Sequence, residues 1–134
     1  GFLMQTFEID RSQDIPLVTS RIYGPRGTRR VQLVFDTGAT KTQFHTPVLE
    51  SIGYSASQAI HMLTMSGPAG PLQEGYSLIL QQLRVLGKTF NDIEVGAFDF
   101  DYLSDDGIDG LLGFDLIREF HLEMNGPRSE LIVY

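Results

Sequence analysis

Asp36-Thr37-Gly38 occurs once in this chain, and its residue types suit acid–base chemistry. It directly follows the strand-like run VQLVF at residues 31–35. A carboxylate at the end of a buried strand is held rigidly, and the glycine behind it lets the backbone approach closely. Chemistry in which two carboxylates share one proton requires a second aspartate nearby. Because the motif is single, that carboxylate would have to come from another copy of the chain.

A downstream segment fits the first motif. Residues 108–117 read IDGLLGFDLI, in which two apolar residues and a glycine end a strand and a short helix follows. Such a segment can pack against the strand that carries Asp36. Gly113 is then explained by the close approach of two backbones. The two segments together are a more specific signal than either one alone.

Residues 33–40 (LVFDTGAT) paired with residues 111–117 (LLGFDLI) resemble the retropepsin-like aspartic proteases, the single-domain relatives of the retroviral proteases, and the bacterial type among them. The resemblance implies a mainly β fold: a closed acid-protease-like β-barrel with a flap hairpin and one or two short helices. It implies one such domain over residues 1–134. It also implies an aspartic endopeptidase that hydrolyses peptide bonds of peptide or protein substrates. Water would be activated by two Asp36 carboxylates, one from each subunit of a homodimer, without a cofactor or metal ion.

The resemblance also assigns roles to single residues. Asp36 would be the catalytic carboxylate, and Thr37 would reach across the two-fold axis to the partner's loop. Gly38 would orient the carboxylate through its backbone amide. Gly113 would support the active-site loop from beneath, and Thr42 would be internally hydrogen-bonded. The tip of a hairpin would close over the substrate as the flap, and its residues are Gly67, Pro68, Ala69 and Gly70.

The residues after the motif predict differences from related enzymes. A serine or threonine in place of Ala39 could donate a hydrogen bond to the outer carboxylate oxygens and stabilise the anion, but alanine cannot. We therefore expect Ala39 to give an activity optimum less acidic than that of pepsin-type enzymes. Thr40 and Lys41 stand where the retroviral enzymes carry acids that hold the substrate backbone. Those substrate contacts are therefore not carried over to this chain.

Turn residues divide the chain into short β segments with two small helices. Strands are expected at 2–9, 17–23, 31–35, 83–86 and 89–100, with a hairpin whose arms are 60–66 and 72–80. Helices are expected at 47–52, capped by Thr46, and at 115–120, capped by Asp115. A final hairpin should turn at residues 125–128.

Length and composition narrow the function classes. The 134 residues fit one domain, and the net charge of −7 argues against nucleic acid as a partner. The absence of cysteine excludes disulfides and thiol catalysis. No membrane span or signal peptide is evident, so we expect a soluble domain without membrane contact. Its compartment and any upstream targeting or anchoring segment stay open.

The remaining charged and titratable groups predict no further site. The histidines are spread without a metal-binding spacing, and the acidic residues of 92–109 lack the pattern of a calcium loop. Four arginines cluster near the turn expected at residues 24–27, and we interpret them as a solvated loop. They are Arg21, Arg26, Arg29 and Arg30.

A second interpretation of the fold stays open. The same domain could serve as a dimerisation or peptide-binding module with little or no catalysis. The intact motif at Asp36 favours the protease without excluding the module, because a groove can bind a peptide without cutting it.

Overall fold

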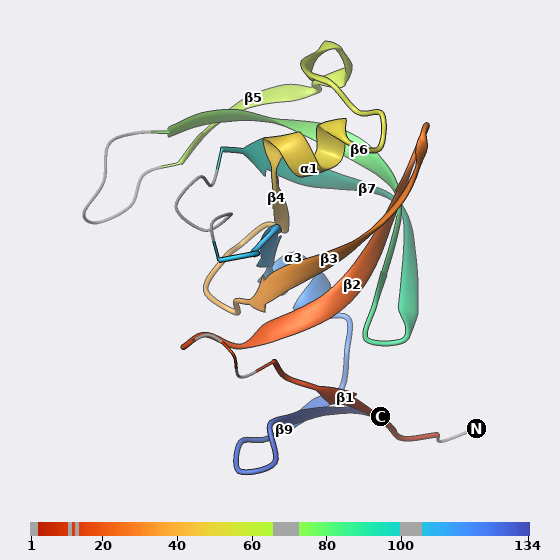
Figure 1. The fold of residues 1–134 in the computed structure, drawn as a ribbon, viewed down its shortest axis with the longest axis vertical. Coiled ribbons are helices and arrows are strands. Elements are labelled where there is room, and N and C mark those ends of the chain that lie inside the picture. The colour runs from red at the N-terminus through yellow and green to blue at the C-terminus, as the bar shows by residue number, and fades with distance from the viewer. Residues whose placement is uncertain (1–2, 11, 13, 66–72, 100–105) are drawn as a thin grey trace.

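The computed structural model describes residues 3–10, 12, 14–65, 73–99 and 106–134. Its central feature is a closed barrel of six strands (Figure 1). In their order around the barrel, the strands are β2 (Leu17–Gly24), β3 (Gly27–Phe35), β8 (Gly110–Leu112), β4 (Gln43–His45), β7 (Lys88–Phe98) and β6 (Gln73–Val85). Pairing of β2 with β6 closes the ring. The expected mainly β, closed-barrel fold is therefore confirmed.

The short strand β8 connects the two sides of the candidate site. It pairs in parallel with β3, with Phe35 opposite Leu112. It also pairs antiparallel with β4, with Phe44 opposite Gly110. The segment between β3 and β4, residues 36–42, therefore passes over the end of β8. We refer to these residues as the Asp36 loop.

Alternation of apolar and polar residues explains how the barrel holds its core. Along β2, Val18, Ser20 and Ile22 are buried whereas Thr19 and Arg21 are exposed, as expected for a strand with one face inward. Burial of the inward side chains is the main stabilising contribution to such a fold. The largest fully buried side chains are Phe44, Ile22, Leu33, Leu49, Leu78, Leu80, Leu83, Ile108, Leu112, Leu131 and Val18.

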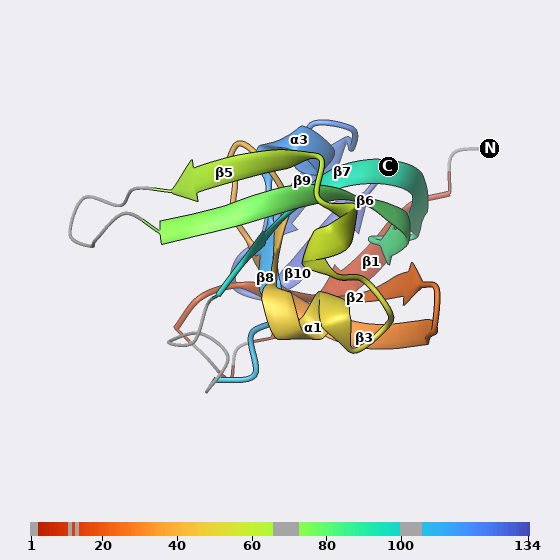
Figure 2. The same cartoon turned by 90° about the horizontal axis from the view of Figure 1, so that it is seen from above.

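A second, three-stranded sheet brings the two ends of the chain together. It contains β1 (Gln5–Glu8), β10 (Glu130–Val133) and β9 (Leu122–Asn125), all antiparallel. Figure 1 shows it below the barrel, and Figure 2 shows the same elements from above. The expected C-terminal hairpin is thus confirmed, and the N-terminal strand adds to its free side.

One strand expectation is wrong. The arms of the hairpin that would carry the flap are β5 (His61–Met65) and β6, which pair antiparallel. However, β6 continues without a break to Val85, so the separate strand expected at 83–86 is wrong. Gln81 lies inside β6, and its backbone amide donates to Tyr54 Oη at 2.8 Å. Gln81 is skipped in the pairing of β6 with β7, but pairing resumes at Gln82, which lies opposite Asn91 on β7 and Tyr23 on β2, so the strand continues.

Both expected helix caps are wrong. Helix α1 (Thr46–Glu50) starts directly after β4, so the extended residue His45 takes the N-cap position that we assigned to Thr46. Helix α3 (Phe114–Ile117) has Gly113 as N-cap, and Asp115 lies inside the first turn. A 3-10 helix at Ala56–Gln58 was not expected. Within the described part of the chain, none of the helices has the length and apolar character needed to cross a membrane.

Candidate active site

Backbone hydrogen bonds fix the position of Asp36 at the end of β3. The amide of Phe35 donates to the carbonyl oxygen of Pro16 at 2.9 Å. The amide of Asp36 itself donates to the carbonyl oxygen of Leu112 at 3.0 Å. Asp36 is therefore held from both neighbouring segments, as a reacting group on a rigid element should be.

The Asp36 carboxylate is half satisfied. The amide of Gly38 donates to Asp36 Oδ1 at 2.9 Å, the interaction expected of that glycine. The amide of Ala39 donates to the Asp36 carbonyl oxygen at 3.2 Å and closes a tight turn. Among the described residues, none donates a hydrogen bond to Oδ2. Thr37 and Gly38 are exposed, so the loop presents the carboxylate at the surface.

A buried network supports the loop from beneath. Thr42 is fully buried, and its Oγ1 donates to Asp115 Oδ1 at 2.8 Å while accepting from the amide of Gly113 at 3.0 Å. The amide of Thr42 donates to the same Asp115 oxygen at 3.0 Å. We call Thr42, Gly113 and Asp115 the supporting network. Because every one of these polar groups is paired, the network holds the loop without an unsatisfied buried atom of its own.

A glycine is required at position 113 because a side chain would collide with neighbouring backbone, and not because of its dihedral angles. A Cβ atom there would lie 2.6 Å from the carbonyl carbon of Lys41 and 2.8 Å from the amide nitrogen of Thr42. The expected close approach of two backbones is therefore confirmed. The backbone it meets follows the motif, whereas we had expected the strand before it. The amide of Phe114 adds a bond to the carbonyl oxygen of Ala39 at 2.7 Å.

Thr40 and Lys41 lie at the end of the loop. Thr40 is exposed, and Lys41 Nζ forms an ion pair with Glu94 Oε2 on β7 at 3.3 Å. Both side chains of the pair are about one third exposed, so the pair contributes little to stability. The charge of Lys41 is therefore paired with a carboxylate of the barrel.

The hairpin β5–β6 extends toward the same side of the barrel as the Asp36 loop (Figure 1). Met65 and Gln73 form the last described pair of the hairpin. The expected flap residues Gly67, Pro68, Ala69 and Gly70 lie outside the described residues. Tyr76 is a half-buried residue of β6, as expected for a strand position. Its burial raises the pKa of the phenol, which Glu50 and Asp99 raise further, so this group stays protonated near neutral pH.

Sequence reasoning missed two aspartates that hold this region together. Asp115 accepts three hydrogen bonds, including one from the amide of Leu116, instead of capping a helix. Asp109 Oδ2 accepts from the amide of Gln32 at 2.8 Å, and Arg29 approaches Asp109 Oδ1 at 3.5 Å. Their partners lie far away in the sequence. The only signal was the position of both residues around the apolar run Leu111–Leu112.

Comparisons with known proteins agree with this geometry. Residues 18–116 match the family model described as aspartyl protease. The fold is similar to the crystal structure of a retropepsin-like aspartic protease from Rickettsia conorii, with a TM-score of 0.67 and 17% sequence identity, covering 98% of this chain and 89% of that chain. A comparison with curated proteins found no match. The chain therefore belongs to the aspartyl protease family and has a retropepsin-like fold.

Proposed function

We propose that the protein is an aspartic endopeptidase that works as a homodimer, with one Asp36 carboxylate from each subunit. The observation that carries the proposal is the half-satisfied carboxylate of Asp36. It is anchored through Oδ1 and the backbone, while Oδ2 accepts no hydrogen bond among the described residues. The contrast is with Asp115, whose Oδ1 accepts three hydrogen bonds and holds the backbone, whereas Asp36 accepts one side-chain hydrogen bond among the described residues and keeps acceptor capacity for acid–base chemistry.

The dimer follows from the number of aspartates that the chemistry needs. Two carboxylates about 3 Å apart cannot both be ionised, so the pair holds a single proton. The Asp-Thr-Gly motif occurs once in the sequence. A second copy of the chain is the simplest source of the second carboxylate, and the exposed Thr37 and Gly38 are free to meet their counterparts across a two-fold axis.

Peptide hydrolysis then proceeds by general acid–base catalysis. The ionised Asp36 takes a proton from a water molecule, whose oxygen attacks the scissile carbonyl carbon. The protonated Asp36 of the second subunit donates its proton to the carbonyl oxygen. The C–N bond of the tetrahedral intermediate then breaks, the nitrogen receives a proton from the pair, and a carboxylic acid and an amine leave.

The other assigned residues act through Asp36. Gly38 would hold one carboxylate oxygen, and Gly113 with the rest of the supporting network would keep the loop in place. Thr37 would clamp the two loops of the dimer. Ala39 leaves the pair without an added hydroxyl donor. The hairpin β5–β6 is proposed as the flap, with Gly67, Pro68, Ala69 and Gly70 at its tip. Residues 1–134 would form one such domain.

A concentration series tests the shared site. Cleavage of a peptide library and molecular mass by sedimentation are measured on the same samples. We expect the activity per chain to fall on dilution as the mass changes from that of a dimer to that of a monomer, because dissociation removes half of each site. A stable monomer with undiminished proteolysis would contradict the proposal.

A mixing experiment separates catalysis from mere binding. An excess of the Asp36→Asn chain should lower the activity of the wild-type chain, because mixed dimers lack one carboxylate. The same amount of serum albumin serves as the control and should have no effect. If neither wild type nor Asp36→Asn cleaves the library but both bind it equally, the domain is a peptide-binding module.

A further inference from the structure

Three arginines from distant parts of the sequence stand in one row across the outer face of the barrel. Arg30 on β3 lies opposite Arg21 on β2, and Arg21 lies opposite Arg84 on β6. Residues directly opposite each other in paired strands project from the same face of the sheet. All three residues are exposed.

This row replaces the basic cluster expected from the sequence. We had placed four arginines in a solvated loop, but among them only Arg26 lies in the turn. Arg29 alternates to the other face of β3, where it meets Asp109. Arg84 joins Arg21 and Arg30 through the pairing that closes the barrel. The charge is thus gathered on strands and belongs to a rigid surface.

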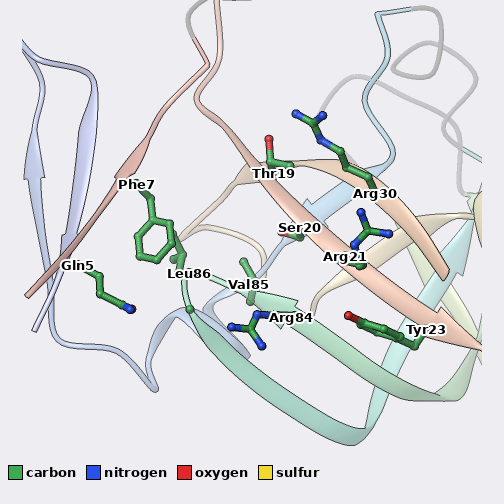
Figure 3. Close-up of a pocket in the computed structure, with 11 residues that line it drawn as sticks. Gln5, Phe7, Thr19, Ser20, Arg21, Tyr23, Arg30, Arg84, Val85 and Leu86 are labelled. Atoms are coloured by element: carbon green, nitrogen blue, oxygen red, sulfur yellow. The ribbon is translucent and has the colours of Figure 1, made fainter. Parts of the chain in front are cut away.

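The row of arginines lines a pocket of about 610 Å³ between the barrel and β1. In Figure 3 the side chains of Gln5 and Phe7 stand on one side of it, and the strands that carry the arginines stand on the other. A pocket of this size falls within the range of small-molecule sites. Among the described residues, no acidic side chain lines it; the lining residues are Gln5, Phe7, Thr19, Ser20, Arg21, Tyr23, Arg30, Arg84, Val85, Leu86 and Gly87. We call it the arginine pocket.

The positive charge of the arginine pocket is largely uncompensated. Arg21 Nη1 donates to Thr28 Oγ1 at 3.2 Å, which uses one of its five donors. Within the described residues, none of the three arginines forms an ion pair with a carboxylate. Arg30 also borders a neighbouring pocket that contains Glu8 and Asp10, so its charge is partly offset there. Arg21 and Arg84 therefore form the centre of the positive region.

Like charges on directly opposite strand positions destabilise a sheet. An anion that bridges Arg21 and Arg84 would remove this repulsion and occupy their free donors. The planar guanidinium group matches phosphate and carboxylate oxygens through two parallel hydrogen bonds. The half-buried rings of Phe7 and Tyr23 add aromatic surface beside the charges. Aromatic rings favour stacking with a second planar group.

We infer that the arginine pocket binds a small organic anion that carries at least two negative charges on phosphate or carboxylate groups and an apolar or aromatic part. The anionic groups lie on Arg21 and Arg84, and the aromatic part lies toward Phe7. The chain as a whole carries a net charge of −7, whereas the arginine pocket is positive. Anions are therefore attracted to this one region of the surface.

The arginine pocket is separate from the candidate active site. Arg30 precedes Asp36 by six positions on an extended segment, which corresponds to roughly 20 Å along the chain. No residue of the Asp36 loop or of the supporting network lines the pocket. Failure of this inference would therefore leave the proposed protease unaffected, and the reverse also holds.

Titration calorimetry on the full chain tests the inference with three probes: ADP, inorganic pyrophosphate and citrate. We expect saturable binding near one equivalent per chain, tightest for ADP, and weaker for all three probes at high salt. The pyrophosphate and citrate arms distinguish a phosphate site from a carboxylate site. Arg84→Gln and Arg21→Gln should each weaken ADP binding about tenfold or more. Phe7→Leu should weaken ADP but leave pyrophosphate unchanged.

Arg26→Gln is the matched control, because it removes the same charge from the adjacent turn outside the pocket. Thermal unfolding checks that each variant is folded. Absence of saturable binding by all three probes at low salt would overturn the inference. So would an equal loss in Arg26→Gln and Arg84→Gln, which would indicate a diffuse charge effect. Binding of a hexaglutamate peptide without any binding of the three probes would also overturn it, in favour of a surface for acidic polypeptide segments.

Discussion

Two aspartates, Asp36 and Asp115, lie on either side of the same crossing of backbones, but the fold supplies them with different numbers of hydrogen-bond donors. Asp115 accepts hydrogen bonds from the amide and hydroxyl of Thr42 and from the amide of Leu116. Among the described residues, the Asp36 carboxylate accepts one, from Gly38, and Asp36 is half-buried beside the exposed Thr37 and Gly38. The carboxylate with three donors on Oδ1 holds the backbone in place, while the carboxylate with a single donor keeps more of its acceptor capacity for chemistry. The difference shows that motif residues can be assigned roles by the number of donors that the fold supplies to them.

The strongest test of this comparison is to remove each charge separately. Asp36→Asn should abolish peptide cleavage, by ~1000-fold or more, because the amide cannot take part in proton transfer. Its thermal unfolding should change little, since the single bond from Gly38 can still be accepted by the amide oxygen. Asp115→Asn should instead lower stability, because three charge-assisted hydrogen bonds to one carboxylate oxygen become weaker bonds to a neutral amide oxygen. Cleavage assays and melting curves on both variants provide the measurement. A large stability loss in Asp36→Asn alone would reverse the two roles.

The supporting network can be broken at its central hydroxyl. Thr42→Val keeps the shape but leaves the Gly113 amide without its acceptor and removes one of the three donors to Asp115 Oδ1, so we expect a loss of about 1–3 kcal/mol in the free energy of unfolding. Thr42→Ser retains the hydroxyl and is the control. Chemical denaturation of both variants gives the difference. Equal stability of the valine and serine variants would indicate that the hydroxyl bonds do not support the loop.

A side chain added at Gly113 should have an effect of similar size. Gly113→Ala would press a methyl group against the backbone of Lys41 and Thr42, and overpacking of this kind costs about 1–3 kcal/mol. Gly126→Ala is the matched control, because a Cβ atom there has no neighbour within 4 Å. We expect a lower melting temperature and lower activity for Gly113→Ala only. A similar effect at both glycines would point to chain entropy instead of contact.

The smallest expected effect is a shift of the pH optimum, caused by a hydroxyl group added beside the Asp36 carboxylate. Ala39→Ser adds a hydroxyl that can donate to the carboxylate pair and stabilise its anionic form. Since one hydrogen bond is worth about 1 kcal/mol, the optimum of cleavage should move by roughly half to one pH unit toward acid. A pH–rate profile of both proteins measures the shift. A wild-type optimum near pH 2 that does not change in the variant would refute the role of Ala39.

Prediction from sequence succeeded for features that depend on neighbouring residues. The strand before Asp36 and the hairpins are set by local alternation and turn chemistry. The caps at Thr46 and Asp115 failed because contacts with distant segments outweighed local preference. His45 continues directly from β4, and Asp115 is recruited by Thr42.

The sequence alone determined which residue types are available for chemistry. It supplies a single Asp-Thr-Gly motif, and therefore one such aspartate per chain, and a glycine where two backbones must touch. The tertiary structure decided which aspartate receives three hydrogen-bond donors and which receives one, and which arginines become neighbours. Arg84 meets Arg21 only because β6 pairs with β2 to close the barrel. Side-chain types are local properties, whereas pairing partners depend on the register between strands that are far apart in the chain.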